Sequence, residues 1–119
     1  MIIAVDMDGT IVKDKWPEIG PLRLGAKWCM NWILSRGHQI IINTCRENEL
    51  LIKALEFMLD NDINWTYSNE NTIERTTQYG GDCRKISADW YIDDRAGFLG
   101  WWSIPIIILC LEWRNRHAI

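Results

Sequence analysis

The most constraining feature of the chain is a short apolar run at its start that ends in two closely spaced carboxylates. Residues 2–5 are continuously apolar, and Asp6 and Asp8 follow, with Gly9 and Thr10 directly after them. An apolar run of this length is typical of a strand that is buried on both faces of a parallel sheet. Open α/β sheets bind ligands at the carboxyl ends of such strands, so the two carboxylates predict a functional site there.

The rest of the chain alternates between strand-like and helix-like segments. We expect strands over 2–6, 38–43, 63–67 and 88–92, and helices over 21–36, 47–59 and 104–116. The last of these segments also fits a strand, and the helical spacing of its apolar residues favours the helix. This order predicts an α/β fold: a three-layer, Rossmann-like parallel sheet flanked by helices on both faces, in a single domain over 1–119.

Two segments between these elements are expected to be loops. Residues 11–20 are predicted to form a loop directly over Asp6 and Asp8. Residues 68–82 are polar and predict a long loop, which could contain a short helix and which has a length common in functional loops. Specificity for a ligand is therefore expected to come from these two loops.

The first predicted helix has clear end signals and two apolar faces. Pro21 suits its first turn, and Gly37 suits the position after its last turn. Its expected core stripe is Leu22, Ala26, Cys29, Met30 and Ile33. Trp28 and Trp32 point away from that stripe, and the last helix has a second apolar face of its own. We therefore predict a homo-oligomer, with packing of the two helices within one subunit as the alternative.

Composition narrows the class of protein. The chain has 119 residues, is 48% hydrophobic and has a net charge of −3, which predicts a packed core and argues against nucleic-acid or anionic-membrane partners. The apolar stretch 104–111 is too short to span a bilayer, and the start of the chain lacks a signal-peptide pattern. The four cysteines show no CxxC spacing, which predicts reduced thiols and a cytoplasmic location.

Polar residues follow three of the predicted strands. Asp6 and Asp8 follow the first strand, Thr44 follows the second, and Asp93 and Asp94 follow the fourth. Because the carboxyl ends of parallel strands share one edge of the sheet, these residues are expected to converge. Adjacent carboxylates repel one another without a cation, and Mg²⁺ prefers oxygen ligands, so a magnesium site is predicted at this edge.

The set of motifs resembles motifs one to four of the haloacid dehalogenase (HAD) superfamily. The matching residues are Asp6-Met-Asp-Gly-Thr10, Thr44, Lys85 and Ile92-Asp93-Asp94, in the family's order. The resemblance covers the chain from residue 1 to about residue 95 and is closest to small, cap-less phosphatase-like members. The segment between the first motif and the first helix and the segment between the third strand and Lys85 are both too short for a cap domain, which implies an open site, a large substrate, or a lid from another subunit.

The resemblance implies a role for each carboxylate. Asp6 would be the nucleophile that forms an aspartyl-phosphate, and Asp8 the general acid that later activates water. Mg²⁺ would bind the carboxylates of Asp6 and Asp93 and the backbone carbonyl of Asp8. Asp94 would orient Lys85 or a metal-bound water.

The resemblance also implies how the phosphoryl group would be held. The Thr44 hydroxyl and the Lys85 ammonium would bind its oxygens, together with the backbone N–H groups of Gly9 and Thr10. Arg46 would meet the leaving group of the substrate. Two alternatives remain open: Thr44 could cap the following helix together with Glu47, and Arg46 could form a surface ion pair with Glu47 or Glu49.

These features predict a Mg²⁺-dependent phosphomonoester hydrolase that acts on a small phosphorylated substrate through an aspartyl-phosphate. One alternative is a nucleotide or polynucleotide-end phosphatase, for which an open site suits a long substrate and the acidic charge does not. Another is a non-catalytic protein that uses a Mg²⁺–phosphate site as a switch. The intact pattern of Asp8, Lys85 and Asp93 favours the enzyme.

Overall fold

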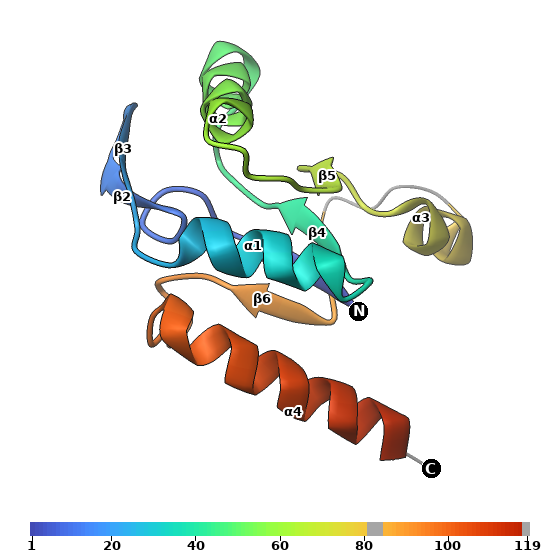
Figure 1. Ribbon diagram of the computed structural model, residues 1–119. Coiled ribbons are helices and arrows are strands. Elements are labelled where there is room, and N and C mark those ends of the chain that lie inside the picture. Colours follow the sequence, from blue (N-terminus) through green and yellow to red (C-terminus); the bar gives the residue numbers. More distant parts are fainter. Residues whose placement is uncertain (81–84, 118–119) are drawn as a thin grey trace.

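The computed structural model describes residues 1–80 and 85–117. Four parallel strands form one sheet in the order β5-β4-β1-β6. These strands are β1 (Ile2–Val5), β4 (Gln39–Ile42), β5 (Tyr67–Ser68) and β6 (Trp90–Ile92). The flanking helices are α1 (Ala26–Ser35), α2 (Asn48–Asp60), α3 (Ile73–Tyr79) and α4 (Ile104–His117) (Figure 1). The predicted α/β class is confirmed, and the arrangement fits a Rossmann-like fold.

The central strand β1 sets the register of the sheet. Val5 lies opposite Ile42 of β4 on one side and Ile92 of β6 on the other, so all three strands end at the same level. Side chains alternate along a strand, and Ile3 and Val5 face a core shared with buried residues of α1, α2 and α4. The residues that follow these strands are therefore brought to one edge.

A two-stranded hairpin replaces the loop expected over 11–20. Strands β2 (Val12–Lys15) and β3 (Glu18–Leu22) pair in an antiparallel manner, with the turn at Trp16-Pro17. Most of its side chains are exposed, so the hairpin has no apolar alternation that would reveal it in the sequence. Gly20 is needed because a Cβ at that position would collide with the carbonyl of Lys13.

The expected start of the first helix at Pro21 was wrong. Pro21 belongs to β3, and α1 begins five residues later at Ala26, after Gly25 in a left-handed conformation (φ 85°). Proline is tolerated at the edge of a two-stranded sheet because its missing N–H group faces no partner strand. The predicted core residues Ala26, Cys29, Met30 and Ile33 are buried, whereas Leu22 is only partly buried.

The third strand and the polar segment that follows it also differ from the expected structure. The third strand was expected over 63–67, but β5 spans only Tyr67–Ser68. The expected long loop after it contains the seven-residue helix α3, which begins after Thr72, whose side chain accepts a hydrogen bond from the N–H of Arg75 (3.3 Å). Residues 81–82 of the predicted loop lie outside the described residues.

The last segment is a helix, as its periodicity indicated. A 3₁₀ turn (Trp101–Ser103) leads directly into α4, and the Ser103 hydroxyl donates to the carbonyl of Gly100 (2.7 Å). Ile104 and Ile108 of α4 are buried, and Glu112 forms a salt bridge with Arg36 at the end of α1 (2.6 Å). Helices α1 and α4 consequently lie side by side (Figure 1).

Large apolar side chains remain on the surface of α1 and α4. Trp28 is 60% exposed and stacks on Trp32, and Ile106 and Trp113 are each 59% exposed. The homo-oligomer expected from these faces stays a prediction. Within the described residues, every helix is too short or too polar to cross a membrane.

Docking of α4 through its buried stripe can be tested with two matched substitutions. Ile108→Ala removes a fully buried side chain and should lower the free energy of unfolding by about 2–5 kcal/mol. Ile106→Ala, two residues away and 59% exposed, should change it by less than about 0.5 kcal/mol. Urea unfolding followed by circular dichroism measures both. Equal effects of the two substitutions would contradict the orientation of α4.

Candidate active site

The carboxyl edge of the sheet contains a strongly acidic cavity of about 280 Å³. It lies where β1, β4 and β6 end, with the hairpin turn as one wall. Its lining residues are Asp6, Asp8, Asp14, Trp16, Thr44, Cys45, Asp93, Asp94 and Arg95. Most of the predicted site residues are therefore brought together, and five carboxylates face one basic side chain among these lining residues.

Asp6 is anchored on both its backbone and its side chain. Its N–H donates to the carbonyl of Ile92 (2.9 Å), which ties it to the end of β6. The hydroxyl of buried Thr10 donates to the Asp6 carboxylate (3.3 Å). The pKa of Asp6 is raised to about 7, mainly by burial and in addition by the negative charges of Asp93 and Asp94. Asp6 is thus held in a place where its negative charge is unfavourable without a cation.

Asp93 and Asp94 complete a three-carboxylate cluster with Asp6. One oxygen of each residue lies within 4.8 Å of the others. Asp93 accepts from the N–H of Arg95 (2.9 Å), and the N–H of Asp94 donates to the Thr10 hydroxyl (3.0 Å). Burial, together with the neighbouring Asp93, raises the pKa of Asp94.

The donor set fits a hard divalent cation. Three carboxylate oxygens at this spacing, in a partly buried cavity, are ligands of the type that Mg²⁺ prefers, and the cavity leaves room for water. Asp8 differs from the other carboxylates because its side chain belongs to a separate ion pair. Because both carboxylate oxygens of Asp8 bind Arg46, the backbone carbonyl is the Asp8 group that could contact a metal, as the resemblance implies.

Gly9 and Thr10 serve the site in a different way from that expected. The N–H of Gly9 donates to the carbonyl of Val12 (2.8 Å) and that of Thr10 to the carbonyl of Met7 (3.3 Å), so neither points freely to a phosphoryl oxygen. Gly9 has a φ of 89°, and a Cβ there would collide with the Asp94 carboxylate. Gly9 therefore makes room for Asp94, and Thr10 links Asp6 to Asp94 through its hydroxyl.

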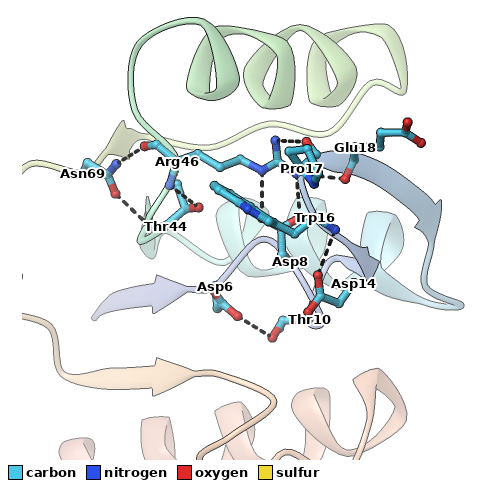
Figure 2. A network of polar contacts seen from close by, with 10 residues as sticks. All are labelled: Asp6, Asp8, Thr10, Asp14, Trp16, Pro17, Glu18, Thr44, Arg46 and Asn69. Carbon is cyan, nitrogen blue, oxygen red and sulfur yellow. Dashed lines mark hydrogen bonds and ion pairs between the residues drawn. The ribbon is translucent and has the colours of Figure 1, made fainter.

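Arg46 forms a buried, bidentate ion pair with Asp8. Its Nε and one terminal nitrogen each donate to a different oxygen of Asp8, both at 2.7 Å. Two further N–H groups of Arg46 donate to the carbonyls of Pro17 (3.1 Å) and Glu18 (3.0 Å) in the hairpin (Figure 2). The Arg46 side chain is 0% exposed. The alternative of a surface ion pair with Glu47 or Glu49 was wrong, and the guanidinium does not face the cavity as a substrate ligand.

Thr44 lines the cavity, but it does not cap the following helix. Helix α2 has Glu47 at its N-cap position, so the alternative of a Thr-x-x-Glu capping box was wrong. The Thr44 hydroxyl instead accepts from the N–H of Arg46 (3.1 Å), which leaves its own O–H group to donate into the cavity.

Two asparagines of the polar segment after β5 position neighbouring residues. Asn69 accepts from the N–H of Thr44 (2.9 Å) and donates to the carbonyl of Arg46 (3.2 Å) (Figure 2). Buried Asn71 accepts from the N–H of Ser87 (2.6 Å) and donates to the carbonyl of Lys85 (3.2 Å). Asn69 therefore holds the main chain at Thr44 and Arg46 beside the cavity, and Asn71 holds the segment that leads into β6.

Lys85, like Gly9, Thr10 and Arg46, is a predicted site residue that does not line the cavity. Its side chain is exposed and is absent from the described residues that line the acidic cavity. Arg95 is the basic side chain on the wall instead. Arg95 was not among the predicted site residues, and its position directly after Asp94 was the available signal.

Three other residues that line the acidic cavity were not predicted from the sequence. Asp14, Trp16 and Cys45 contribute to the wall, and two of them come from the hairpin that was expected to be a loop. The signal that could have found them is the tryptophan–proline pair within a short segment that must pass over the first two carboxylates.

The Arg46–Asp8 pair should be strongly coupled in stability. Arg46→Met leaves a largely buried carboxylate unpaired and should lower the free energy of unfolding by about 3–5 kcal/mol, measured by urea unfolding. The double variant Asp8→Leu/Arg46→Met should lose less than the sum of the two single variants. Arg114→Met, on the exposed last turn of α4, is the matched control. Strict additivity would show that the pair is not coupled.

No protein-family model and no curated protein matches the chain significantly. Among solved structures, the chain is similar to a conserved protein coded by a locus from Bacteroides thetaiotaomicron, with 30% sequence identity and a TM-score of 0.80. The match covers 100% of this chain and 98% of that chain, so it includes the sheet, the hairpin and all described site residues. The chain belongs to the same family as this conserved Bacteroides protein.

Proposed function

We propose that the protein is a Mg²⁺-dependent phosphomonoester hydrolase of the HAD type. The observation that carries the proposal is the convergence of Asp6, Asp93 and Asp94, whose oxygens lie within 4.8 Å of one another. The family resemblance implies that Asp6 is the nucleophile and a metal ligand, that Asp93 is a metal ligand, and that Asp94 orients Lys85 or a metal-bound water. Thr44 lies on the wall of the same cavity, at the position implied for phosphoryl binding.

Charge explains why such a site needs a cation before it can admit a phosphate. A phosphate dianion would be repelled by carboxylates in a partly buried cavity, and Arg95 supplies a single positive charge among the lining residues. Mg²⁺, when bound, supplies Lewis-acid stabilisation of the phosphoryl oxygens and offsets the charge of the carboxylates. We propose that Asp6 and Asp93 bind it, with Asp94 alongside them.

The proposed reaction has two balanced steps. In the first, a carboxylate oxygen of Asp6 attacks phosphorus, the bond to the leaving oxygen breaks, and that oxygen takes a proton from Asp8. In the second, water attacks the phosphorus of the aspartyl-phosphate, the bond between phosphorus and the Asp6 oxygen breaks, and Asp8 takes one proton from the water. Inorganic phosphate leaves, Asp6 is again a carboxylate, and Asp8 has regained the proton that it gave in the first step.

The ion pair with Arg46 limits how Asp8 can act as the proposed general acid. Arg46 donates to both Asp8 oxygens, so one of these hydrogen bonds must open before Asp8 can hold a proton. The remaining bond still orients the carboxyl group, and the Thr10 hydroxyl orients Asp6 in the same way. We propose that the Thr44 hydroxyl and the Arg95 guanidinium bind phosphoryl oxygens, because both residues line the cavity. Lys85 would join them only if its exposed side chain reached the cavity.

Asp6→Asn tests the nucleophile directly. The amide cannot attack phosphorus, so the kcat for phosphate release from p-nitrophenyl phosphate should fall at least about 1,000-fold. Asp60→Asn makes the same chemical change at an exposed position at the end of α2 and should leave the kcat unchanged. Removal of Mg²⁺ with a chelator should abolish activity in the parent.

Three results would contradict this proposal. Hydrolysis by Asp6→Asn at the parent rate would exclude Asp6 as the nucleophile, and full activity in chelator would exclude the cation. Mg²⁺-dependent binding of a phosphate analogue without turnover, across sugar phosphates, nucleotides and phosphorylated oligonucleotides, would favour a non-catalytic switch protein.

A further inference from the structure

Trp16 is a large side chain on the wall of the acidic cavity, and the hydrolytic steps do not use it. It is the aromatic residue among the described lining residues, and it is 52% exposed. An indole ring that is half exposed beside a polar site offers apolar surface that a ligand could cover. Its place at the hairpin turn puts it opposite the sheet edge that carries Asp6.

The ring is held in a defined orientation. The Arg46 guanidinium lies over it, with the central carbon 5.0 Å from the ring centroid (Figure 2). The N–H of Trp16 donates to Asp14 (3.1 Å), and the next two carbonyls accept from Arg46. One side of the ring is therefore covered by a buried cation, and the surface that solvent reaches lies away from Arg46. A pre-oriented ring loses little conformational entropy when a ligand stacks on it.

The ion pair between Arg46 and Asp8 also places Trp16 close to the position expected for the leaving group. Asp8 must reach the leaving oxygen to protonate it, and Asp8 is bound at 2.7 Å by the same guanidinium that stacks on Trp16. The leaving group must therefore depart on the side of the cavity where Trp16 stands. The atoms attached to the leaving oxygen are then the part of the substrate that meets the indole ring.

From this placement we infer that Trp16 is a stacking surface for a planar ring in the leaving group. The substrate class is a phosphomonoester with an aromatic ring close to the phosphate, either an aryl phosphate or a nucleoside monophosphate. This inference rests on the proposed phosphomonoesterase activity and narrows its substrates. Trp16 is a specificity residue that takes no part in the bond-breaking steps.

The test compares substrates with and without a ring in the parent, Trp16→Ala and Trp16→Phe. For p-nitrophenyl phosphate and adenosine monophosphate, Trp16→Ala should lower kcat/KM roughly 10-fold to 100-fold, mainly through KM. For glycerol 3-phosphate, which has no ring, the same variant should keep the parent kcat/KM, which also shows that the site is still folded. Trp16→Phe should retain most of the activity on both ring substrates, and Trp113→Ala, another exposed tryptophan, should match the parent.

The two ring substrates distinguish between the possible sources of the ring. A loss confined to adenosine monophosphate assigns the surface to a nucleobase, and a loss confined to p-nitrophenyl phosphate assigns it to an aryl group next to the phosphate. An equal loss on glycerol 3-phosphate, or no loss on either ring substrate, overturns the inference.

A binding measurement separates this inference from the proposed activity. If the parent hydrolyses none of these substrates, the hydrolase proposal fails, and calorimetry with Mg²⁺ present decides the role of Trp16. At least tenfold weaker binding of adenosine monophosphate to Trp16→Ala, with unchanged binding of inorganic phosphate, supports the stacking surface. Equal binding of adenosine monophosphate to parent and variant overturns it.

Discussion

The bidentate contact between Arg46 and Asp8 is the interaction on which the site most depends. It joins the turn after β1 and the hairpin that follows it to the segment after β4, 38 residues beyond Asp8, because two hairpin carbonyls also accept from Arg46. A two-stranded hairpin is only marginally stable by itself. A buried arginine must have partners for its charge and its donors, so the pair fixes the hairpin over the sheet edge. The cavity has a wall because of this contact.

The second constraint is the crowding of carboxylates at that edge. The register of β1, β4 and β6 places their ends at one level, and Thr10 links Asp6 to Asp94 through a single hydroxyl. Gly9 has no side chain where the Asp94 carboxylate lies. Three mutually repelling carboxylates do not stabilise a fold. Their close placement is better explained by the cation that we propose they bind.

The sheet and the carboxylate cluster could be predicted because they follow from local patterns. Continuous apolar runs such as 40–42 mark buried parallel strands, and the topology of such sheets brings their carboxyl ends together. The last helix was predictable from its apolar spacing. The position of Asp93 and Asp94 beside Asp6 required only that the fourth strand lie next to the first, which is where β6 pairs.

The hairpin and the partners of Arg46 could not be predicted because they depend on tertiary contacts. The side chains of β2 and β3 are mostly exposed, and Pro21 suits a helix start as well as an edge strand. Nothing local to Arg46 distinguishes a surface ion pair with Glu47 from a buried pair with Asp8, 38 residues away. The same holds for Asn69, whose contacts with Thr44 and Arg46 exist only once β5 lies beside β4.

The proposed nucleophile and cation site can be tested in a crystal structure grown with Mg²⁺ and beryllium fluoride, a mimic of a phosphoryl group. We expect beryllium fluoride on a carboxylate oxygen of Asp6, the cation bound between Asp6 and Asp93, and the Thr44 hydroxyl on a fluoride. Attachment to any other residue, or a cation bound away from the three-carboxylate cluster, would contradict the proposal.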